Sequence, residues 1–225
     1  MTHPFVVDTG SDRSVRWQGI GMSLVEFDLR GLGPGEAPER AAVAAAADAG
    51  ALLVRGPVAA LSAVLAALVR AGRTAEVPVS WEPADDASSR GLARDLGIGT
   101  GAERELSLVR DDHGGVLLQH GRYEAAEKGR LPLAARLGVQ AHHDDQRVAD
   151  GTVARIEVRP DWTAVDTLRV VVSPQLMRPP RRSTGRALQL ASDPAQVTRD
   201  GVVFPRPVTR WTWYADDRVR WRLRP

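Results

Sequence analysis

The chain contains no cysteine, which excludes disulfides, thiolate catalysis and cysteine-ligated zinc. No apolar run approaches the roughly 20 residues that a membrane-spanning helix needs, so no transmembrane segment is predicted. The first residues hold no basic segment followed by an apolar one, and a signal peptide is therefore not expected. These absences together predict a cytoplasmic protein.

What is present is ordinary for a globular protein. The 225 residues are 43% hydrophobic and 26% charged, enough for one good core or two small ones. Almost every basic residue is an arginine, and because alanine is abundant as well, the arginine count reflects compositional bias and says little about ligands. The net charge of +2 argues against a nucleic-acid partner.

The first 50 residues suggest two strands and a helix. Phe5–Val7 is a short strand candidate, and Gly19–Leu29 contains a second one. Pro38 stands where a first helical residue would, ahead of the alanine-rich stretch Glu39–Ala49. Gly50 is placed to end that helix in the left-handed conformation.

The stretch from Ala51 to Ile98 has the framework of a parallel sheet covered by helices. Val58–Arg70 carries apolar residues at helical spacing, and short apolar runs stand on either side of it. The expected elements are a strand at Ala51–Val54, a helix at Val58–Arg70, a strand at Val77–Val79, a polar turn at Trp81–Ser89 and a helix at Gly91–Ile98.

The second half changes to short β-rich segments separated by Gly, Pro and Asp turns. Asp112–Gly115 reads as a hairpin turn, and Pro174–Arg182 as an exposed loop. A transition near Gly99–Gly101 predicts two domains, residues 1–100 and 101–225. The expected fold is an α/β N-terminal domain followed by a β-rich, sandwich-like C-terminal domain. Its predicted strands are Glu105–Arg110, Val116–Gln119, Val153–Arg159, Leu168–Ser173, Arg186–Ala191 and Trp211–Tyr214.

The order of these elements, from Asp48 to Gly201, resembles the catalytic domain of the diacylglycerol kinase and lipid kinase family, whose fold is shared with NAD kinases. Gly91–Ile98, which reads Gly-Leu-Ala-Arg-Asp-Leu-Gly-Ile, is similar to the family's helix after its second glycine-rich turn. Gly185–Gln189 and the Asp-Gly pair at the end of Val197–Gly201 fall where the family has a late strand and turn. The resemblance implies ATP and magnesium as cofactors and a lipid as phosphoryl acceptor.

The family's turns, however, are degenerate in this chain. The first turn, Arg55–Ala59, keeps one glycine, lacks the family's aspartate, and contains a proline that removes a backbone donor. The second, Trp81–Asp86, lacks the flanking glycines, although Asp86 matches the family's aspartate. The third, Asp200–Val202, ends in valine where the family often has an acidic base. Phosphoryl transfer depends on phosphate positioning and charge neutralisation, so these departures predict impaired catalysis.

Three functions remain open. The first is a pseudoenzyme, a small-molecule-binding, lipid-binding or scaffolding module with a site in an interdomain cleft at Arg55, Gly56, Trp81, Asp85 and Asp86. The second is a divergent lipid kinase that uses ATP and magnesium, with Asp86 and Asp200 as catalytic residues beside Asp85. The third is a homodimer assembled through the C-terminal segment.

Two other groups have both a chemical and a simpler interpretation. In His142–Asp145, His143 and Asp145 are the better metal pair, and the resemblance implies that Asp144 or Asp145 could hold magnesium; an exposed polar turn is the simpler interpretation. Ser88 and Ser89 lie near Asp85 and Asp86, but no hydrolase elbow surrounds them, and helix capping explains them better.

The C-terminus interleaves arginine with aromatic residues, a composition suited to stacking on bases or to a protein interface. The pattern predicts a last hairpin, with Trp211–Tyr214 and Val219–Leu223 as strands and Asp216-Asp217 as the turn. Its outer face would be the dimer surface. The segment comprises Arg206, Arg210, Trp211, Trp213, Tyr214, Arg218, Arg220, Trp221, Arg222 and Arg224.

Overall fold

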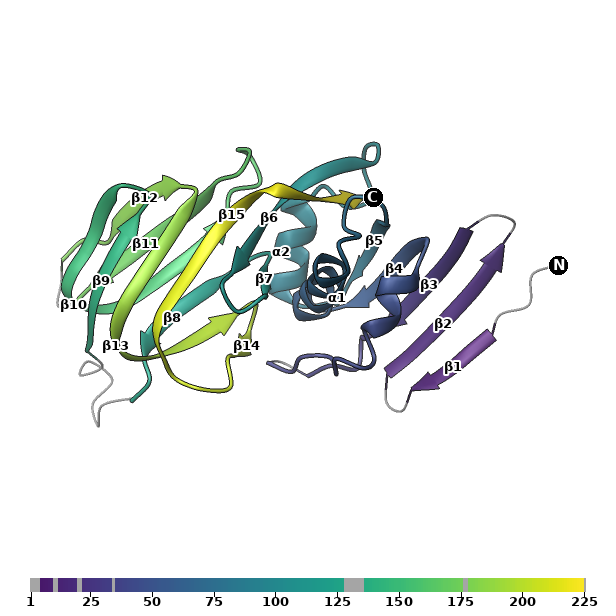
Figure 1. Cartoon of the computed structure of the whole chain (residues 1–225), viewed down its shortest axis with the longest axis horizontal. Coiled ribbons are helices and arrows are strands. Elements are labelled where there is room, and N and C mark those ends of the chain that lie inside the picture. The colour runs from purple at the N-terminus through teal and green to yellow at the C-terminus, as the bar shows by residue number, and fades with distance from the viewer. Residues whose placement is uncertain are drawn as a thin grey trace. The chain divides into compact units, whose positions relative to one another are not determined.

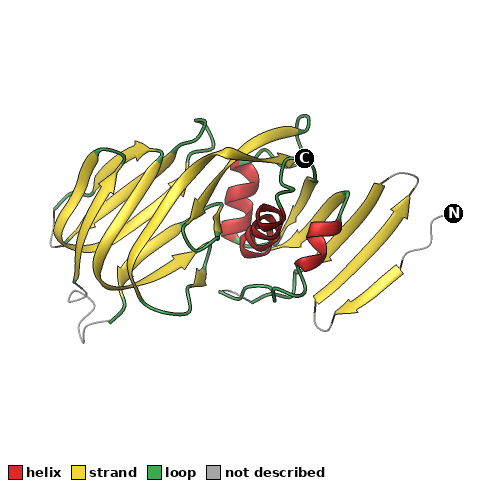
Figure 2. Cartoon of the chain, viewed as in Figure 1, coloured by secondary structure: helices red, strands yellow, loops and turns green. Residues whose placement is uncertain are grey.

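The computed structural model describes residues 5–9, 12–19, 22–33, 35–127, 136–175 and 178–224. Strands predominate and helices are few (Figures 1 and 2), which agrees with an α/β part followed by a β-rich part. The chain groups into two compact units, the first comprising Met1–Leu108, Gly114–Val116 and Asp217–Pro225, and the second Val109–His113 and Leu117–Asp216. The division into domains 1–100 and 101–225 stays a prediction, and the last nine residues group with the first unit.

The first unit is built on a sheet that changes direction at its third strand. β1 (Phe5–Thr9), β2 (Asp12–Gly19) and β3 (Met22–Asp28) pair antiparallel in succession. From β3 onward the pairing is parallel, first to β4 (Ala51–Gly56) and then to β5 (Pro78–Pro83). The carboxyl ends of β3, β4 and β5 therefore share one edge of the sheet, which we call the carboxyl edge.

Helix α1 (Val58–Ala71) connects β4 to β5 and confirms the predicted helix. Ten of its residues are buried, Leu65 completely, and it packs against β4 (Figure 1). Gly72 ends it with φ +70°, while the backbone N–H of Arg73 donates to the carbonyl of Leu68 at 2.9 Å. This left-handed glycine cap satisfies carbonyls that the end of a helix leaves free.

The helix predicted at Glu39–Ala49 is wrong; only a short 3-10 helix forms, η1 (Ala44–Asp48). Besides Ala42, the buried side chains here are Val43, Ala46 and Ala49, which are spaced by three. That is the period of a 3-10 helix rather than of an α-helix. The residue after η1 continues in extended conformation, and Gly50 does not have the positive φ expected of a cap.

Strand β5 runs further than the sequence suggested, through Trp81 to Pro83. Helix α2 (Ala87–Asp95) accordingly begins and ends earlier than the predicted Gly91–Ile98. Gly97 has φ +60°, and the N–H of Ile98 donates to the carbonyl of Ala93 at 2.9 Å. The glycine inside the family-like motif thus terminates the helix.

The second unit contains a closed circuit of antiparallel strands. The long strands β10 and β13 each pair with both β8 and β9, which links the strands in a ring. β13 changes partner around Pro194, where its register shifts, and proline is tolerated at such irregularities. The strands of this part of the chain are β6 (Arg104–Asp111), β7 (Val116–Leu117), β8 (Gly121–Ala125), β9 (Leu137–His143), β10 (Gln146–Pro160), β11 (Leu168–Pro174), β12 (Arg181–Gly185), β13 (Ala187–Arg199), β14 (Val202–Val203) and β15 (Val208–Leu223).

The prediction of a C-terminal hairpin is wrong, because β15 is one continuous strand. Its first part pairs with β13, and its last residues, Arg222 and Leu223, pair parallel with β5. Asp216 lies within the strand, where Arg110 of β6 donates to its carboxylate at 2.6 Å, so the expected turn residue is neutralised in an extended chain. Trp211, Trp213 and Trp221 are fully buried, so these rings are core and not an outer interaction surface.

The proline- and arginine-rich stretch Pro174–Arg182 is only in part the loop that was expected. β11 ends at Pro174, β12 begins at Arg181, and residues 178–180 between them are exposed; residues 176 and 177 lie outside the described part. Within the described ranges no helix combines the length and apolarity that a membrane crossing requires.

Candidate functional site

Ligands of open α/β sheets bind beyond the carboxyl ends of parallel strands, which makes the carboxyl edge of the first unit the first candidate site. Arg55, near the end of β4, pairs with Glu26 of β3 and donates from Nε to Glu82 of β5 at 2.6 Å. Beyond β3, Arg30 Nε donates to Asp28 at 2.8 Å, and this hydrogen bond lowers the pKa of the Asp28 carboxyl. Arg55 is thus committed to two carboxylates of its own sheet.

Position 56 requires a glycine because the backbone of Leu29 passes close to it. Its φ is +145°, and a Cβ added here would lie 2.8 Å from the carbonyl oxygen of Leu29. The Gly56 carbonyl accepts from the backbone N–H of Ala84 at 3.0 Å and from Trp81 Nε1 at 3.1 Å. Trp81 is itself buried, so its indole ties β5 to the end of β4 inside the core. The glycine and the tryptophan both have structural roles at this turn.

The amino ends of the two helices at this edge differ in the backbone donors that they offer. α1 follows Pro57, which has no backbone N–H to offer. α2 is capped by Asp86, whose carboxylate accepts from Ser89 N at 2.8 Å and from Ser89 Oγ at 2.6 Å. The capping interpretation of this segment is confirmed. Asp85 is almost fully exposed and pairs with Arg90.

Asp200 belongs to the second unit, whereas Asp86 belongs to the first. The Asp200 carboxylate accepts three backbone N–H groups, from Leu118, Gln119 and His120, at 2.8–2.9 Å. Asp200 and Gly201 both have positive φ and connect β13 to β14, as an Asp-Gly pair does in a tight hairpin. The Asp-Gly signature is therefore explained by a turn and an anchored loop.

The two residues of the predicted metal pair, His143 and Asp145, differ in solvent exposure. His143 is buried at the end of β9, and its Nδ1 lies 2.6 Å from Ser183 Oγ. Burial lowers the pKa of the His143 imidazole. Asp145 is exposed in the following turn, and Asp144 accepts the backbone N–H groups of Arg186 and Ala187. No third ligand joins His143 and Asp145 among the groups found within the described residues.

Sequence reasoning missed a different group, Asp111, Asp112 and His113, whose ligand atoms lie within 4.8 Å of one another. Asp111 is buried and accepts from Arg199 at 2.7 Å, while the His113 ring stacks on Trp211 with 4.5 Å between centroids. The Asp-His-Gly-Gly run was interpreted as a hairpin turn alone, and only the fold brings Arg199 and Trp211 to it. Because Asp111 is already engaged by a guanidinium, the group reads as a structural cluster.

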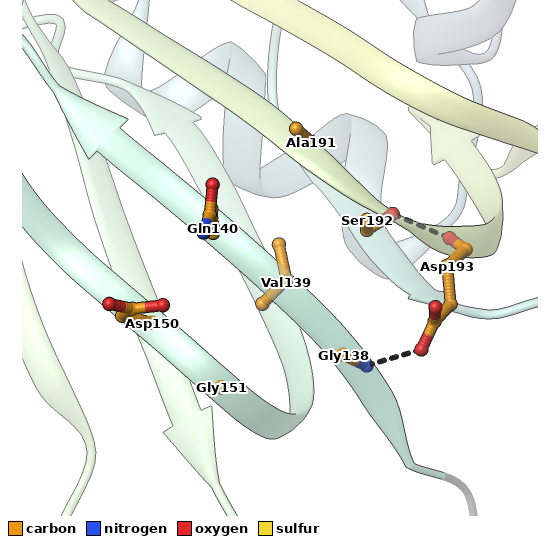
Figure 3. Close-up of a pocket in the computed structure, with 8 residues that line it drawn as sticks. All are labelled: Gly138, Val139, Gln140, Asp150, Gly151, Ala191, Ser192 and Asp193. Atoms are coloured by element: carbon orange, nitrogen blue, oxygen red, sulfur yellow. Dashed lines mark hydrogen bonds between the residues drawn. The ribbon is translucent and has the colours of Figure 1, made fainter.

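The described residues of the second unit line a groove and a cavity. One is a groove of about 320 Å³ over β9, β10 and β13 (Figure 3), where Asp193 accepts from Gly138 N at 3.2 Å and Asp150 stands across β9. The other, which we call the arginine cavity, has a volume of about 620 Å³ and is lined by β10, β11 and β12. Its charged lining residues are Arg155, Glu157, Arg159, Arg169 and Arg182.

No family model matches the sequence, and no curated protein matches it either. Solved structures do. A diacylglycerol kinase from Bacillus anthracis strain Sterne is 11% identical and superposes with a TM-score of 0.61, over 83% of each chain. An NAD kinase from Archaeoglobus fulgidus in complex with ATP is 9% identical, with a TM-score of 0.51, over 84% of this chain and 82% of the other. The chain therefore has the fold that diacylglycerol kinases share with NAD kinases.

Proposed function

We propose that this chain is a small-molecule-binding, lipid-binding or scaffolding protein that has kept a lipid-kinase-like fold and does not transfer phosphoryl groups. The observation that carries the proposal is that each helix amino end at the carboxyl edge has lost a backbone donor, one to a proline and the other to a carboxylate. Pro57 removes a donor before α1, and the Asp86 carboxylate occupies the first turn of α2.

Phosphoryl transfer requires free backbone donors and cations around the phosphates. At the carboxyl edge the backbone N–H of Ser89 is taken by Asp86, and Arg55 is held by Glu26 and Glu82. A triphosphate arriving here would have to displace these internal partners and approach carboxylates. Gly56 and Asp200, the remnants of two family turns, each have a structural explanation in the contacts they make.

The groups that remain at this edge favour a different ligand chemistry. Asp85 and Glu82 are paired with Arg90 and Arg55, but their side chains are still 95% and 51% accessible, so their carboxylates can accept further hydrogen bonds from a ligand. A molecule that presents hydroxyl groups, such as a polyol or the head of a neutral lipid, suits such acceptors better than a phosphate does. Trp81 is left out of this proposed site because it is buried.

A transfer assay tests the proposal. The protein is incubated with γ-labelled ATP, magnesium and vesicles containing diacylglycerol, and label in the lipid is measured against an active lipid kinase as positive control. We expect no transfer above the background of the protein-free reaction. Transfer that disappears in the double variant Asp85→Asn, Asp86→Asn would instead establish the alternative, a divergent lipid kinase dependent on ATP and magnesium.

A further inference from the structure

The arginine cavity gathers positive charge on one face of the second unit. Four guanidinium groups and a single carboxylate, that of Glu157, line a volume of about 620 Å³. Cavities of a few hundred cubic ångströms are typical of small-molecule sites. All the lining residues belong to the second unit.

The alternation of the strands brings these side chains to one face. Along β10, Arg155, Glu157 and Arg159 alternate with buried apolar residues, so they point away from the core. The register places Arg159 directly opposite Arg169 of β11, and Val171 of β11 opposite Arg182 of β12. Neighbouring strands are about 4.8 Å apart, so the long side chains of Arg159 and Arg182 can converge over β11.

The positive charge of this face is only partly neutralised. Asp161 holds the fork of Arg169, with Nε and Nη2 donating at 2.7 and 2.8 Å, and Arg155 lies 3.3 Å from Glu157. In the part of the chain that the structure describes, Arg159 and Arg182 make no ion pair. Arg159 also stands directly opposite Arg169, and like charges in that position on a sheet are unfavourable. An anion placed between Arg159 and Arg182 would neutralise positive charge that no described carboxylate matches.

The cavity also offers apolar contact. Val171 and Pro180 line it together with the aliphatic stems of the arginines, which cover apolar surface while their charged ends reach outward. Guanidinium groups bind phosphate oxygens in pairs, through short charge-assisted hydrogen bonds. We propose that the arginine cavity binds an organic phosphate, with Arg159 and Arg182 on the phosphate group and Val171 and Pro180 against an apolar body. This site goes beyond the function proposed above and does not depend on it.

The experiment uses naphthyl phosphate as the probe, titrated in the absence of magnesium and followed by its fluorescence, with naphthol as the uncharged control. We expect saturable binding of the phosphate alone, and competition by inorganic pyrophosphate. The double variant Arg159→Gln, Arg182→Gln should bind at least about tenfold more weakly, because two charge-assisted contacts are lost. Arg181→Gln is the matched control, since Arg181 is exposed on the same strand but does not line the cavity.

A second arm identifies the source of the phosphate. Sedimentation with phosphatidylcholine vesicles, with and without phosphatidic acid, asks whether a lipid headgroup is bound; dependence on phosphatidic acid that is lost in the double variant assigns the site to a lipid. Binding of naphthyl phosphate without vesicle binding assigns it to a soluble phosphate. The proposal is overturned if neither probe binds, or if Arg181→Gln loses as much affinity as the double variant. The thermal midpoint of the double variant checks folding and should not fall, because the changes remove like charges.

Discussion

The carboxyl edge of the first unit and the arginine cavity of the second differ in how their charges are matched. At the carboxyl edge each arginine has an acidic partner, and Arg55 has two. In the arginine cavity Arg159 and Arg182 have none among the described residues. At the carboxyl edge, where open α/β sheets bind ligands, these arginines are all paired with carboxylates of the chain itself. The unpaired arginines lie instead on β10 and β12, which carry no nucleotide motif. The fold of this chain therefore does not by itself predict where the chain binds a ligand.

The largest effect is expected from disrupting the helix behind the carboxyl edge. Leu65 is fully buried in α1, and Leu65→Asp would bury an unpaired carboxylate at a cost of several kcal/mol, on the order of 4 or more. We expect loss of soluble protein or a large fall in thermal midpoint. Arg70→Asp, at an exposed position of the same helix, should cost about 1 kcal/mol or less. Equal effects of the two changes would contradict the packing of α1.

Substitution of Gly56 tests whether this glycine has a structural role or a phosphate-binding one. Gly56→Ala should destabilise the fold by about 3 kcal/mol, because strain at φ +145° adds to a 2.8 Å approach to the Leu29 carbonyl. Gly99→Ala, where φ is +82° and no atom lies within 4 Å, should cost only about 1 kcal/mol. Denaturant unfolding measures both. A smaller cost at Gly56 than at Gly99 would mean that its turn is open.

Asp200 tests whether the late turn is structural. Asp200→Ala should cost about 2 kcal/mol, since it leaves three backbone donors without their carboxylate. Asp200→Asn keeps one oxygen and tolerates the positive φ, so its cost should be smaller. Chemical denaturation of both variants gives the comparison. If Asp200→Ala unfolds at the denaturant concentration of the parent, the anchoring role is wrong.

The helix cap of α2, at the carboxyl edge of the first unit, is expected to contribute less to stability. Removing the capping oxygen in Asp86→Ala should cost about 1 kcal/mol, whereas Asp86→Asn should cost less because asparagine also caps helices. Thermal unfolding of the two variants would resolve this order. The reverse order would indicate that the negative charge, rather than the cap, is what this position requires.

The prediction with the smallest effect at neutral pH is a dependence of stability on pH that arises in the second unit. Because burial lowers the pKa of His143, the unfolded chain takes up a proton near pH 6.5 before the folded chain does. Stability should therefore fall as pH drops below about 6.5, by up to about 1.4 kcal/mol per pH unit for one proton, until the folded-state pKa is reached. Substituting His143→Gln should reduce this slope and leave the part that comes from His120, whose pKa burial also lowers. His142→Gln, at an exposed neighbour, is the control.

The sequence predicted the local elements of the first unit better than the distant pairings. The period of α1 and the capping of α2 are local and could be read directly. β2, whose residues are mostly polar, was not predicted, and β8 and β9 were missed because they pair with β13, far along the chain. The largely exposed β12, which pairs with β11, was missed as well. β15 was mistaken for a hairpin since two aspartates resemble a turn until Arg110 is placed beside Asp216.

The site was predictable only in its departures from the family pattern. Pro57 could be identified as an obstacle to phosphate binding from residue type alone, whereas Asp86 was interpreted as a match to the family's aspartate. The commitment of Arg55 to Glu26 and Glu82 could not, because it requires three parallel strands in register. The arginine cavity was invisible in a chain whose basic residues are almost all arginine. Its distinguishing feature, the lack of carboxylates opposite Arg159 and Arg182, exists only in the folded sheet.

Calorimetry with ATP, in matched titrations with and without magnesium, tests the central claim most directly. If the carboxyl edge no longer binds nucleotide, adding magnesium should create no new binding; any binding seen without it should vanish in the Arg159→Gln, Arg182→Gln variant. A magnesium-dependent isotherm in the micromolar range that survives in that variant would contradict the account, because it would require a functional nucleotide site elsewhere in the protein.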